Sequence, residues 1–276
     1  MGEAVQMLDD LATFKIPALL MSGGEPLMHP NFFELAQYVK MWGLRLTLST
    51  NGTLITQDMA KRIVALGPAY VGISFDGLYG VNDRFRGMDS AFRKALGGLI
   101  RLKELGQRVG LRFTLTRRNI ESLPGIFEMV EREGIDRVCF YHLVYAGRGR
   151  HLAEGHDAQA EKVYRWLTWN GGGANSSGVG IAHIDTQGNV HPDQFWQEVT
   201  FGNVKERPFS QIWQDESNPM LRSLRNRLPL LAGRCGECQW KPLCGGSFRV
   251  RAQFTHGDPW ASDPACYLTN EEVGCA

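Results

Sequence analysis

The chain has 276 residues, 43% of them apolar, so it can bury a sizeable core and form one large domain plus a smaller one. Its 30 basic and 29 acidic residues give a net charge of +1, which excludes a general electrostatic affinity for nucleic acid or a membrane surface. No apolar run approaches 18 residues and the first residues do not form a signal-peptide pattern, so we expect a cytoplasmic protein.

The first half of the chain alternates strand-like and helix-like segments, after an opening helix at 3–14 that no strand precedes. Strand-like apolar runs occupy 17–22, 44–49, 70–75, 109–115 and 137–145. Several are nearly continuous in apolar residues, which is typical of parallel strands covered on both faces. Helical periodicity fills the intervals, from Asn31 to Gly43 and near 56–66, 90–106 and 121–133. This repeat predicts an α/β fold with a parallel sheet, curved or closed.

Two local features of these segments carry predictions of their own. Asn31 and Glu34 have the spacing of a capping box at the start of their helix. Cys139 lies inside the apolar run VCFYHLV, so we expect its thiol to be buried in the core.

The alternation stops at about residue 150, which predicts a first domain at 1–150 and a second at 151–276. In the second domain a short helix is expected near 158–168. A hairpin is then expected in GIAHIDTQGNVHPDQFW, with its turn at residues 187–189.

Short helices near 207–213 and 217–227 lead from this hairpin to the last part of the chain. The second domain is therefore small and poor in strands. A bound metal cluster would supply the stability that its core lacks.

Four cysteines near the C-terminus have the spacing C-x2-C-x5-C-x21-C: Cys235, Cys238, Cys244 and Cys266. Thiolates packed this closely indicate a metal or a metal–sulfur cluster, and a reducing compartment favours metal binding over disulfides. From the spacing alone, structural disulfides and a structural zinc remain alternatives to a cluster.

Polar segments follow all five predicted strands, at 22–26, 49–53, 74–77, 116–119 and 146–150. The carboxyl ends of parallel strands meet at one edge of a sheet, where the loops build ligand sites. Gly23 and Gly24 let the backbone approach a ligand closely, and Glu25 adds a carboxylate. Such a site suits a ligand with an amine, a carboxylate and a ribose.

Three of these segments resemble the radical S-adenosylmethionine enzymes: GGEP, STNGT and SFDG, the last followed by NDRFRG. The run FGNVKERPFSQIW and the later cysteines resemble the SPASM or twitch extension of that family. The resemblance covers essentially the whole chain. It implies a partial (β/α)6-type barrel that lacks its first strand, followed by a small cysteine-rich SPASM/twitch domain.

The resemblance also implies the cofactors. S-adenosylmethionine would bind the first domain, and an auxiliary 4Fe–4S cluster would bind Cys235, Cys238, Cys244 and Cys266. By this resemblance Gly23, Gly24 and Glu25 would contact the methionyl amine of S-adenosylmethionine, and Ser74 and Arg86 would bind its carboxylate and ribose. Asn51 would line the same pocket, and Leu143 would lie against the adenine.

Within the family, FYHLVYAGRGR, WNGGGANSSGVGI and NVHPDQFW are most similar to the tetrapyrrole-modifying branch that serves haem d1 biosynthesis, near the alternative haem synthases. The implied substrate is a tetrapyrrole with propionate side chains. Arginines pair bidentately with carboxylates, so Arg148 and Arg150 are candidates for binding it, with Arg117 and Arg118 on a neighbouring loop. His191 is a candidate ligand or hydrogen-bond partner of an iron tetrapyrrole.

The chain departs from the family in one respect. The motif C-x3-C-x2-C, whose thiolates hold the radical-generating 4Fe–4S cluster, does not occur in it. Together with the missing first strand, this predicts a truncated form that is inactive as it stands, or else a degenerate paralogue. The radical-generating cluster is expected in the full-length protein only.

In the intact enzyme, the resemblance implies that a 5′-deoxyadenosyl radical abstracts hydrogen from a propionate carbon. A flavodoxin or ferredoxin would supply electrons to a monomeric protein. Two alternatives remain open: a peptide-modifying SPASM maturase, and a zinc-stabilised binding protein without catalytic activity.

Overall fold

The structure, a computed structural model, describes residues 1–142 and 176–274. It divides into two compact units, one ending at His142 and the other beginning at Leu143, whereas we predicted a boundary after residue 150. The helix expected near 158–168 lies outside the described residues. No helix in the described ranges is long and apolar enough to cross a membrane.

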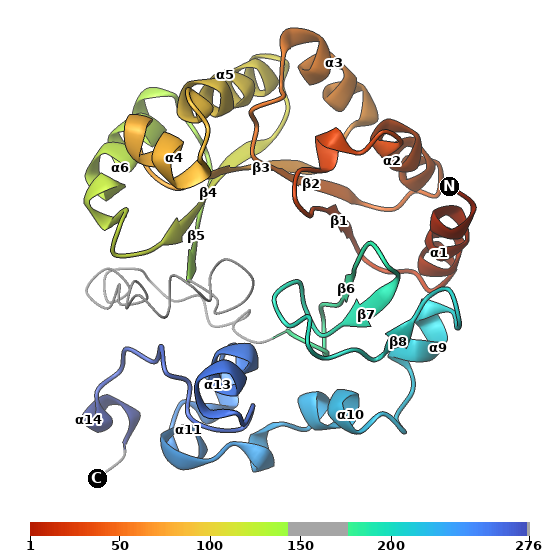
Figure 1. Ribbon diagram of the computed structural model, residues 1–276, viewed down its shortest axis with the longest axis vertical. Coiled ribbons are helices and arrows are strands. Elements are labelled where there is room, and N and C mark those ends of the chain that lie inside the picture. Colours follow the sequence, from red (N-terminus) through yellow and green to blue (C-terminus); the bar gives the residue numbers. More distant parts are fainter. Residues whose placement is uncertain (143–175, 275–276) are drawn as a thin grey trace. The chain divides into compact units, whose positions relative to one another are not determined.

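The first unit is built on a five-stranded parallel sheet whose strands follow one another in chain order (Figure 1). They are β1 (Leu19–Met21), β2 (Leu46–Thr50), β3 (Tyr70–Phe75), β4 (Val109–Leu115) and β5 (Val138–His142). All four pairings are parallel, so the predicted α/β class and parallel sheet are confirmed. The bounds of β3 and β4 are those that the sequence predicted.

Helices form an outer layer along this sheet (Figure 1). They are α1 (Gly2–Thr13), α2 (Phe32–Met41), α3 (Gln57–Leu66), α4 (Tyr79–Arg86), α5 (Ala91–Glu104) and α6 (Leu123–Arg132), with short 3-10 turns η1 (Pro26–Met28) and η2 (Ile120–Ser122). Helix α4 was not predicted. The capping box at the start of α2 does not form, because the side-chain Nδ2 of Asn31 donates to the Glu34 carboxylate and the Asn31 side chain does not cap the backbone.

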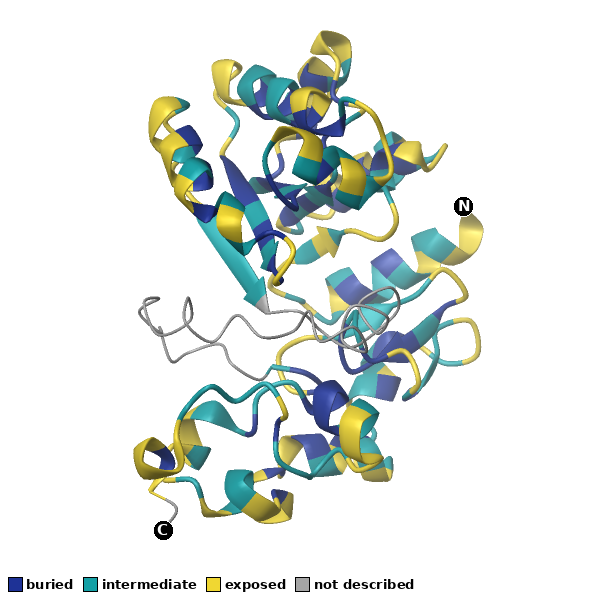
Figure 2. Cartoon of the chain, turned by 60° about the vertical axis from the view of Figure 1, so that its left-hand side comes forward, coloured by how far each residue is buried: buried dark blue, intermediate teal, exposed yellow. Residues whose placement is uncertain are grey.

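The two faces of the sheet differ in character. Val71, Ile73, Leu111 and Phe113 are fully buried on the face that packs against the helices. Alternate positions, which point to the other face, are polar or glycine. Figure 2 shows buried residues on the strands and on the inner sides of the helices. The prediction of strands that are apolar on both faces was therefore wrong.

The second unit contains a small antiparallel sheet of β6 (His183–Ile184), β7 (Asn189–His191) and β8 (Gly202–Asn203). The predicted hairpin is confirmed, with Gly188 at φ +92° in its turn, and β8 is a third strand that was not predicted. Trp196, Ile212, Leu221 and Leu224 are buried beside it.

Short helices follow the small sheet and lead through the cysteines. They are α9 (Phe209–Trp213), α10 (Pro219–Arg225), η3 (Leu228–Leu230), α11 (Gly233–Glu237), α12 (Lys241–Cys244), α13 (Arg249–His256) and α14 (Asn270–Val273). The two helices predicted near 207–213 and 217–227 correspond to α9 and α10.

Candidate functional site

The residues predicted to contact the ligand lie at the ends of neighbouring strands. Gly23 and Gly24 follow β1, Asn51 follows β2 and Ser74 is in β3, and these strands pair in that order. An added Cβ at either glycine would meet nothing within 4 Å, so the backbone at this loop is open to close approach. Gly23 has φ +134°, a conformation that side-chain-bearing residues rarely adopt.

Glu25 joins the first two of these loops. One oxygen, Oε1, accepts hydrogen bonds from Thr50 Oγ1 at 2.7 Å and from the Leu27 amide at 3.2 Å. The other, Oε2, accepts from the Asn51 amide at 2.7 Å. Hydrogen bonds to a carboxylate are stronger than those between neutral groups. Glu25 thus connects the β1 and β2 loops, a role that was not predicted.

Two polar groups at this edge are left for a ligand. Asn51 Oδ1 accepts from the Thr53 amide at 2.9 Å and from its hydroxyl at 2.7 Å, which fixes the orientation of the Asn51 side chain. Within the described part of the chain, neither Asn51 Nδ2 nor the Ser74 hydroxyl has a hydrogen-bond partner. Both can therefore bind an incoming polar ligand.

Arg86 lies at the end of α4, close to the third strand end. Its Nε lies 2.6 Å from Oδ2 of Asp76, the carboxylate of SFDG, which is only 6% exposed. The Asp76 amide in turn donates to Asn82 Oδ1 at 2.8 Å. Asp76 therefore orients a half-buried guanidinium, which the sequence had placed at the site without naming this partner.

Arg112 of β4 is a further cation on the polar face of the sheet, and sequence reasoning missed it. Its guanidinium donates to Ser49 Oγ of β2, and its Cζ lies 4.8 Å from the centre of the Tyr141 ring of β5. Gly72 makes room for the side chain, because a Cβ there would lie 2.7 Å from Arg112 Cδ. Among the described residues Arg112 has no carboxylate partner.

The same face carries Cys139, which the register places opposite Arg112. Cys139 is half-buried, so the prediction of a core thiol was wrong. Alternation was the missed signal, since polar residues or glycine recur at every second position of LRLTLS, YVGISF and VGLRFTL.

Of the other predicted first-domain residues, three fall outside the described ranges and two follow β4 at this same edge. Leu143, Arg148 and Arg150 lie outside the described residues. Arg117 and Arg118 follow β4 and are exposed.

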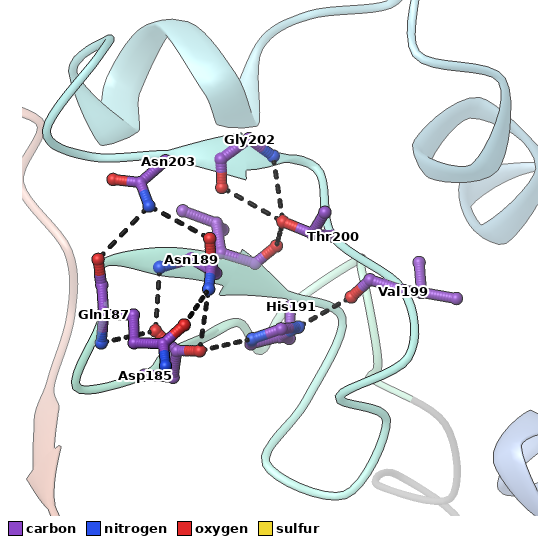
Figure 3. A network of polar contacts seen from close by, with 9 residues as sticks. Asp185, Gln187, Asn189, His191, Val199, Thr200, Gly202 and Asn203 are labelled. Carbon is purple, nitrogen blue, oxygen red and sulfur yellow. Dashed lines mark hydrogen bonds and ion pairs between the residues drawn. The ribbon is translucent and has the colours of Figure 1, made fainter.

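His191 of β7 belongs to a hydrogen-bonded network in the small sheet (Figure 3). Its Nδ1 lies 2.7 Å from the Val199 carbonyl oxygen and its Nε2 lies 3.2 Å from Asp185 Oδ2. The ring is 3% exposed and stacks on His183, with centroids 6.0 Å apart. Both nitrogens already face acceptors, so the geometry gives His191 a structural role in place of the iron-binding role that the sequence suggested.

Asp185 is the centre of this network. It accepts from the backbone amides of Gln187 and Asn189 at 2.8 and 2.9 Å and from Asn189 Nδ2 at 3.0 Å. Burial opposes ionisation of Asp185, but these hydrogen bonds and that from His191 outweigh it and hold its pKa well below the ordinary value. Burial, and then the neighbouring His191, lower the pKa of His183.

The four cysteines of the ladder are free thiols, and each sulfur is a hydrogen-bond acceptor. Cys235 accepts from the Asp263 amide at 3.3 Å and Cys238 from the Trp240 amide at 3.4 Å. Backbone amides also donate to the other two sulfurs, from Gly246 to Cys244 and from Leu268 to Cys266.

Three of these four donors lie two residues after the cysteine that they contact. Amides directed at sulfur stabilise a thiolate, the form that binds metal. These hydrogen bonds favour the thiolate form, but at Cys244 and Cys266 burial outweighs them.

Three of the thiols also influence one another. Burial, followed by Cys235 and then Asp263 and Cys266, raises the pKa of Cys244 to about 11. Burial likewise raises the pKa of Cys266. Among the described residues no three His, Cys, Asp or Glu side chains are arranged around a position for a single metal ion. Burial disfavours ionisation of these thiols, and a bound metal compensates their negative charge when they ionise.

Comparison with known proteins gives these features a context. The model of the radical SAM superfamily matches residues 1–130, and that of SPASM, an iron–sulfur cluster-binding domain, matches residues 177–239. Fe-coproporphyrin III synthase of Methanosarcina barkeri is 43% identical over 99% of this chain and 81% of its own length. Pre-heme d1 synthase of Dinoroseobacter shibae is 41% identical over 100% of this chain and 80% of its own.

A solved structure of anSMEcpe with bound AdoMet and the Cp18Cys peptide has a TM-score of 0.70 to this chain. The match covers 96% of this chain and 85% of the anSMEcpe chain, at 16% identity. At that identity the likeness shows the fold alone.

Replacement of Glu25 by Gln tests the connection between the first two loops. We expect Glu25→Gln to lower the free energy of unfolding by about 1.5–3 kcal/mol, because the amide nitrogen of Gln cannot accept from a backbone N–H. Urea unfolding without ligand measures this, with Glu104→Gln at an exposed position of α5 as the control. Equal stability of both variants would show that Glu25 does not hold the loops together.

The Asp185 network predicts a pH dependence. Because the pKa of Asp185 is lower in the folded state, its ionisation stabilises the fold above the unfolded pKa of about 4 and ceases to do so as the pH falls through the folded value. We expect Asp185→Asn to be less stable than the native chain at pH 7, by a difference that shrinks at pH 3. Urea unfolding at both pH values measures the difference, with the exposed Glu216→Gln as the control. A difference independent of pH would contradict the low pKa.

Proposed function

The chain belongs to the radical SAM superfamily and carries an iron–sulfur cluster-binding SPASM domain, and we propose that it acts on the propionate side chains of an iron tetrapyrrole. The observation that most supports this substrate is the high identity, over nearly the whole chain, to two enzymes named for tetrapyrrole synthesis. By that relationship its place is haem d1 or haem biosynthesis, with a reductant such as a flavodoxin or ferredoxin as partner.

S-adenosylmethionine fits the edge formed by the first three strands. The open backbone at Gly23 and Gly24 admits its amino acid part, and Asn51 Nδ2 and the Ser74 hydroxyl supply polar contacts. Arg86, oriented by Asp76, supplies a positive charge for its carboxylate. When bound, this cofactor is the source of the adenosyl radical in the family.

The radical-generating cluster is a different case. The 276 residues contain no C-x3-C-x2-C motif, so they do not provide its three thiolates, and no reaction step through it follows from these residues.

We propose Cys235, Cys238, Cys244 and Cys266 as ligands of one auxiliary 4Fe–4S cluster. Amide donors at all four sulfurs, and repulsion among the ionised forms of Cys235, Cys244 and Cys266, suit thiolates around a cationic core. Such a cluster supplies one-electron transfer, because with four protein ligands its irons are coordinatively filled.

Arg112 is our candidate for binding a propionate of the substrate. It lies at the centre of the polar face, held by Ser49 and Tyr141, and no carboxylate of the described chain neutralises it. A guanidinium in this setting pairs well with a carboxylate from outside the chain.

Metal analysis tests the proposed ligands. After anaerobic reconstitution we expect about four iron and four sulfide per chain with brown absorbance, and a large loss of both in Cys238→Ser. Cys139→Ser is the matched control and should keep its iron, since Cys139 belongs to the sheet of the first unit. One zinc per chain without sulfide would contradict the cluster and favour a zinc-stabilised protein.

Absorbance titration tests the substrate. We expect the chain to bind Fe-coproporphyrin III, and Arg112→Met to weaken that binding on the order of 10- to 100-fold through loss of one charged hydrogen-bonded contact. Lys61→Met, at an exposed position of α3, is the control and should bind like the native chain.

Two other results of this titration have distinct meanings. If the native chain causes no spectral change in Fe-coproporphyrin III but binds a peptide, the substrate is a peptide and not a tetrapyrrole. If Arg112→Met binds Fe-coproporphyrin III as tightly as the native chain does, Arg112 is not part of the binding site, but the tetrapyrrole substrate class stands.

A further inference from the structure

Arg249 is the first residue of α13, five residues after Cys244, and its side chain is buried to 99%. One guanidinium nitrogen, Nη1, donates to the carbonyl oxygens of Pro259 and Ala261 at 3.0 and 2.7 Å. The other two nitrogens, Nε and Nη2, are buried without any hydrogen-bond partner among the described residues. A buried cation with unpaired donors is strongly unfavourable unless negative charge lies nearby.

The carboxylate that attracts Arg249 most, that of Asp263, forms its ion pair with another arginine. Asp263 is held by Arg251, whose Nε donates to Oδ1 at 2.9 Å and whose Nη2 pairs with Oδ2. A third arginine, Arg227, is 6% exposed and also has a buried nitrogen, Nη1, without a partner. Burial, and then repulsion from Arg249, lower the pKa of Arg227 to about 10. Two buried guanidinium groups, those of Arg249 and Arg251, thus share one carboxylate, and a third lies close enough to repel Arg249.

The missing negative charge is at the cysteine ladder. After Asp263, the groups that attract Arg249 are Cys235 and Cys244 in their ionised form. It also lies against the loop that holds Cys244, because a Cβ at Gly246 would come within 2.8 Å of Arg249 Cζ. The amide of that same Gly246 donates to the Cys244 sulfur. Gly246, at φ +76°, therefore brings a guanidinium and a thiol loop into direct contact.

We propose that Arg249 is the charge partner of the auxiliary cluster, retaining it in the protein and raising its reduction potential. This rests on the proposed ligation by the four cysteines. A 4Fe–4S cluster with four thiolates is a net anion, and reduction adds a further negative charge. A fixed buried cation stabilises the reduced form more than the oxidised one. Arg227, which repels Arg249, adds to the positive potential of the same region.

The experiment compares the native 276-residue chain with Arg249→Met, Arg249→Lys and, as a control, the exposed Arg222→Met. The chain has no C-x3-C-x2-C motif, so a redox titration reports on one cluster. At a fixed solution potential we expect Arg249→Met to lower the ratio of reduced to oxidised cluster at least tenfold, which corresponds to about 59 mV for one electron. Arg249→Lys should give a ratio between those of Arg249→Met and the native chain, and the control should give the ratio of the native chain.

Stability with and without the cluster separates this role from a structural one. Without iron, Arg249→Met removes an uncompensated cation, so we expect a urea midpoint equal to or above that of the native chain. With the cluster, we expect a lower midpoint and faster loss of iron. If Arg249 only binds the carbonyl groups of Pro259 and Ala261, both midpoints fall equally and the potential stays unchanged. That result overturns the proposal.

Two further results would have a different meaning: failure of the native chain to bind a cluster, and failure of Arg249→Met to fold. A native chain that takes up no iron and sulfide contradicts the proposed ligation itself, and this inference with it. If Arg249→Met does not fold, as judged by circular dichroism, Arg249→Lys and Arg227→Met test the proposal in its place. Both are expected to lower the reduction potential of the cluster. An unchanged potential in both variants overturns the proposal.

Discussion

Parallel pairing of five strands in chain order is the constraint on which the first unit depends. Because β1, β2 and β3 are direct neighbours, the loops that follow them lie side by side, and Glu25 can bind Thr50 and Asn51 of the next loop. The same pairing aligns side chains across the strands, so that Ser49, Gly72 and Arg112 fall on one face. The proposed cofactor edge and the proposed substrate face thus both follow from one ladder of backbone hydrogen bonds.

The second unit depends on a different balance. Its sheet has three short strands, and its helices near the cysteines have four to eight residues, too short to be stable alone. Its buried polar content is large: Arg227, Arg249 and Arg251 are nearly inaccessible to solvent. Charge compensation therefore replaces part of the apolar core, and we propose that the compensating anion is the cluster. In this view cluster binding and folding are coupled.

The elements that the sequence predicted well are those with a local signal. The runs YVGISF and VGLRFTL end at turn residues and gave the bounds of β3 and β4, and the turn at Gly188 gave the hairpin. Helix α4 was missed because the polar run after SFDG has little apolar periodicity. The partners of Glu25, Arg112 and His191 lie 25, 63 and 8 residues away in the chain, so no local pattern identifies them. The polar face was the exception, since its alternation was present in the sequence and was read as continuous apolar character.

The electrostatics around the cysteines also bear on what an auxiliary cluster would do. Backbone amides directed at all four sulfurs stabilise negative charge on the ligands. The proposed role of Arg249 acts in the same direction, so both favour the reduced state. Four thiolates, moreover, leave no iron position open for substrate. A centre with these properties is suited to accept an electron. If the carboxylate of a propionate leaves a substrate radical as carbon dioxide, the two remaining carbons form a vinyl group and one electron is released, so such an acceptor is required. The carboxylate-binding role of Arg112 and the electron-accepting role of the cluster are thus complementary parts of the chemistry that we propose.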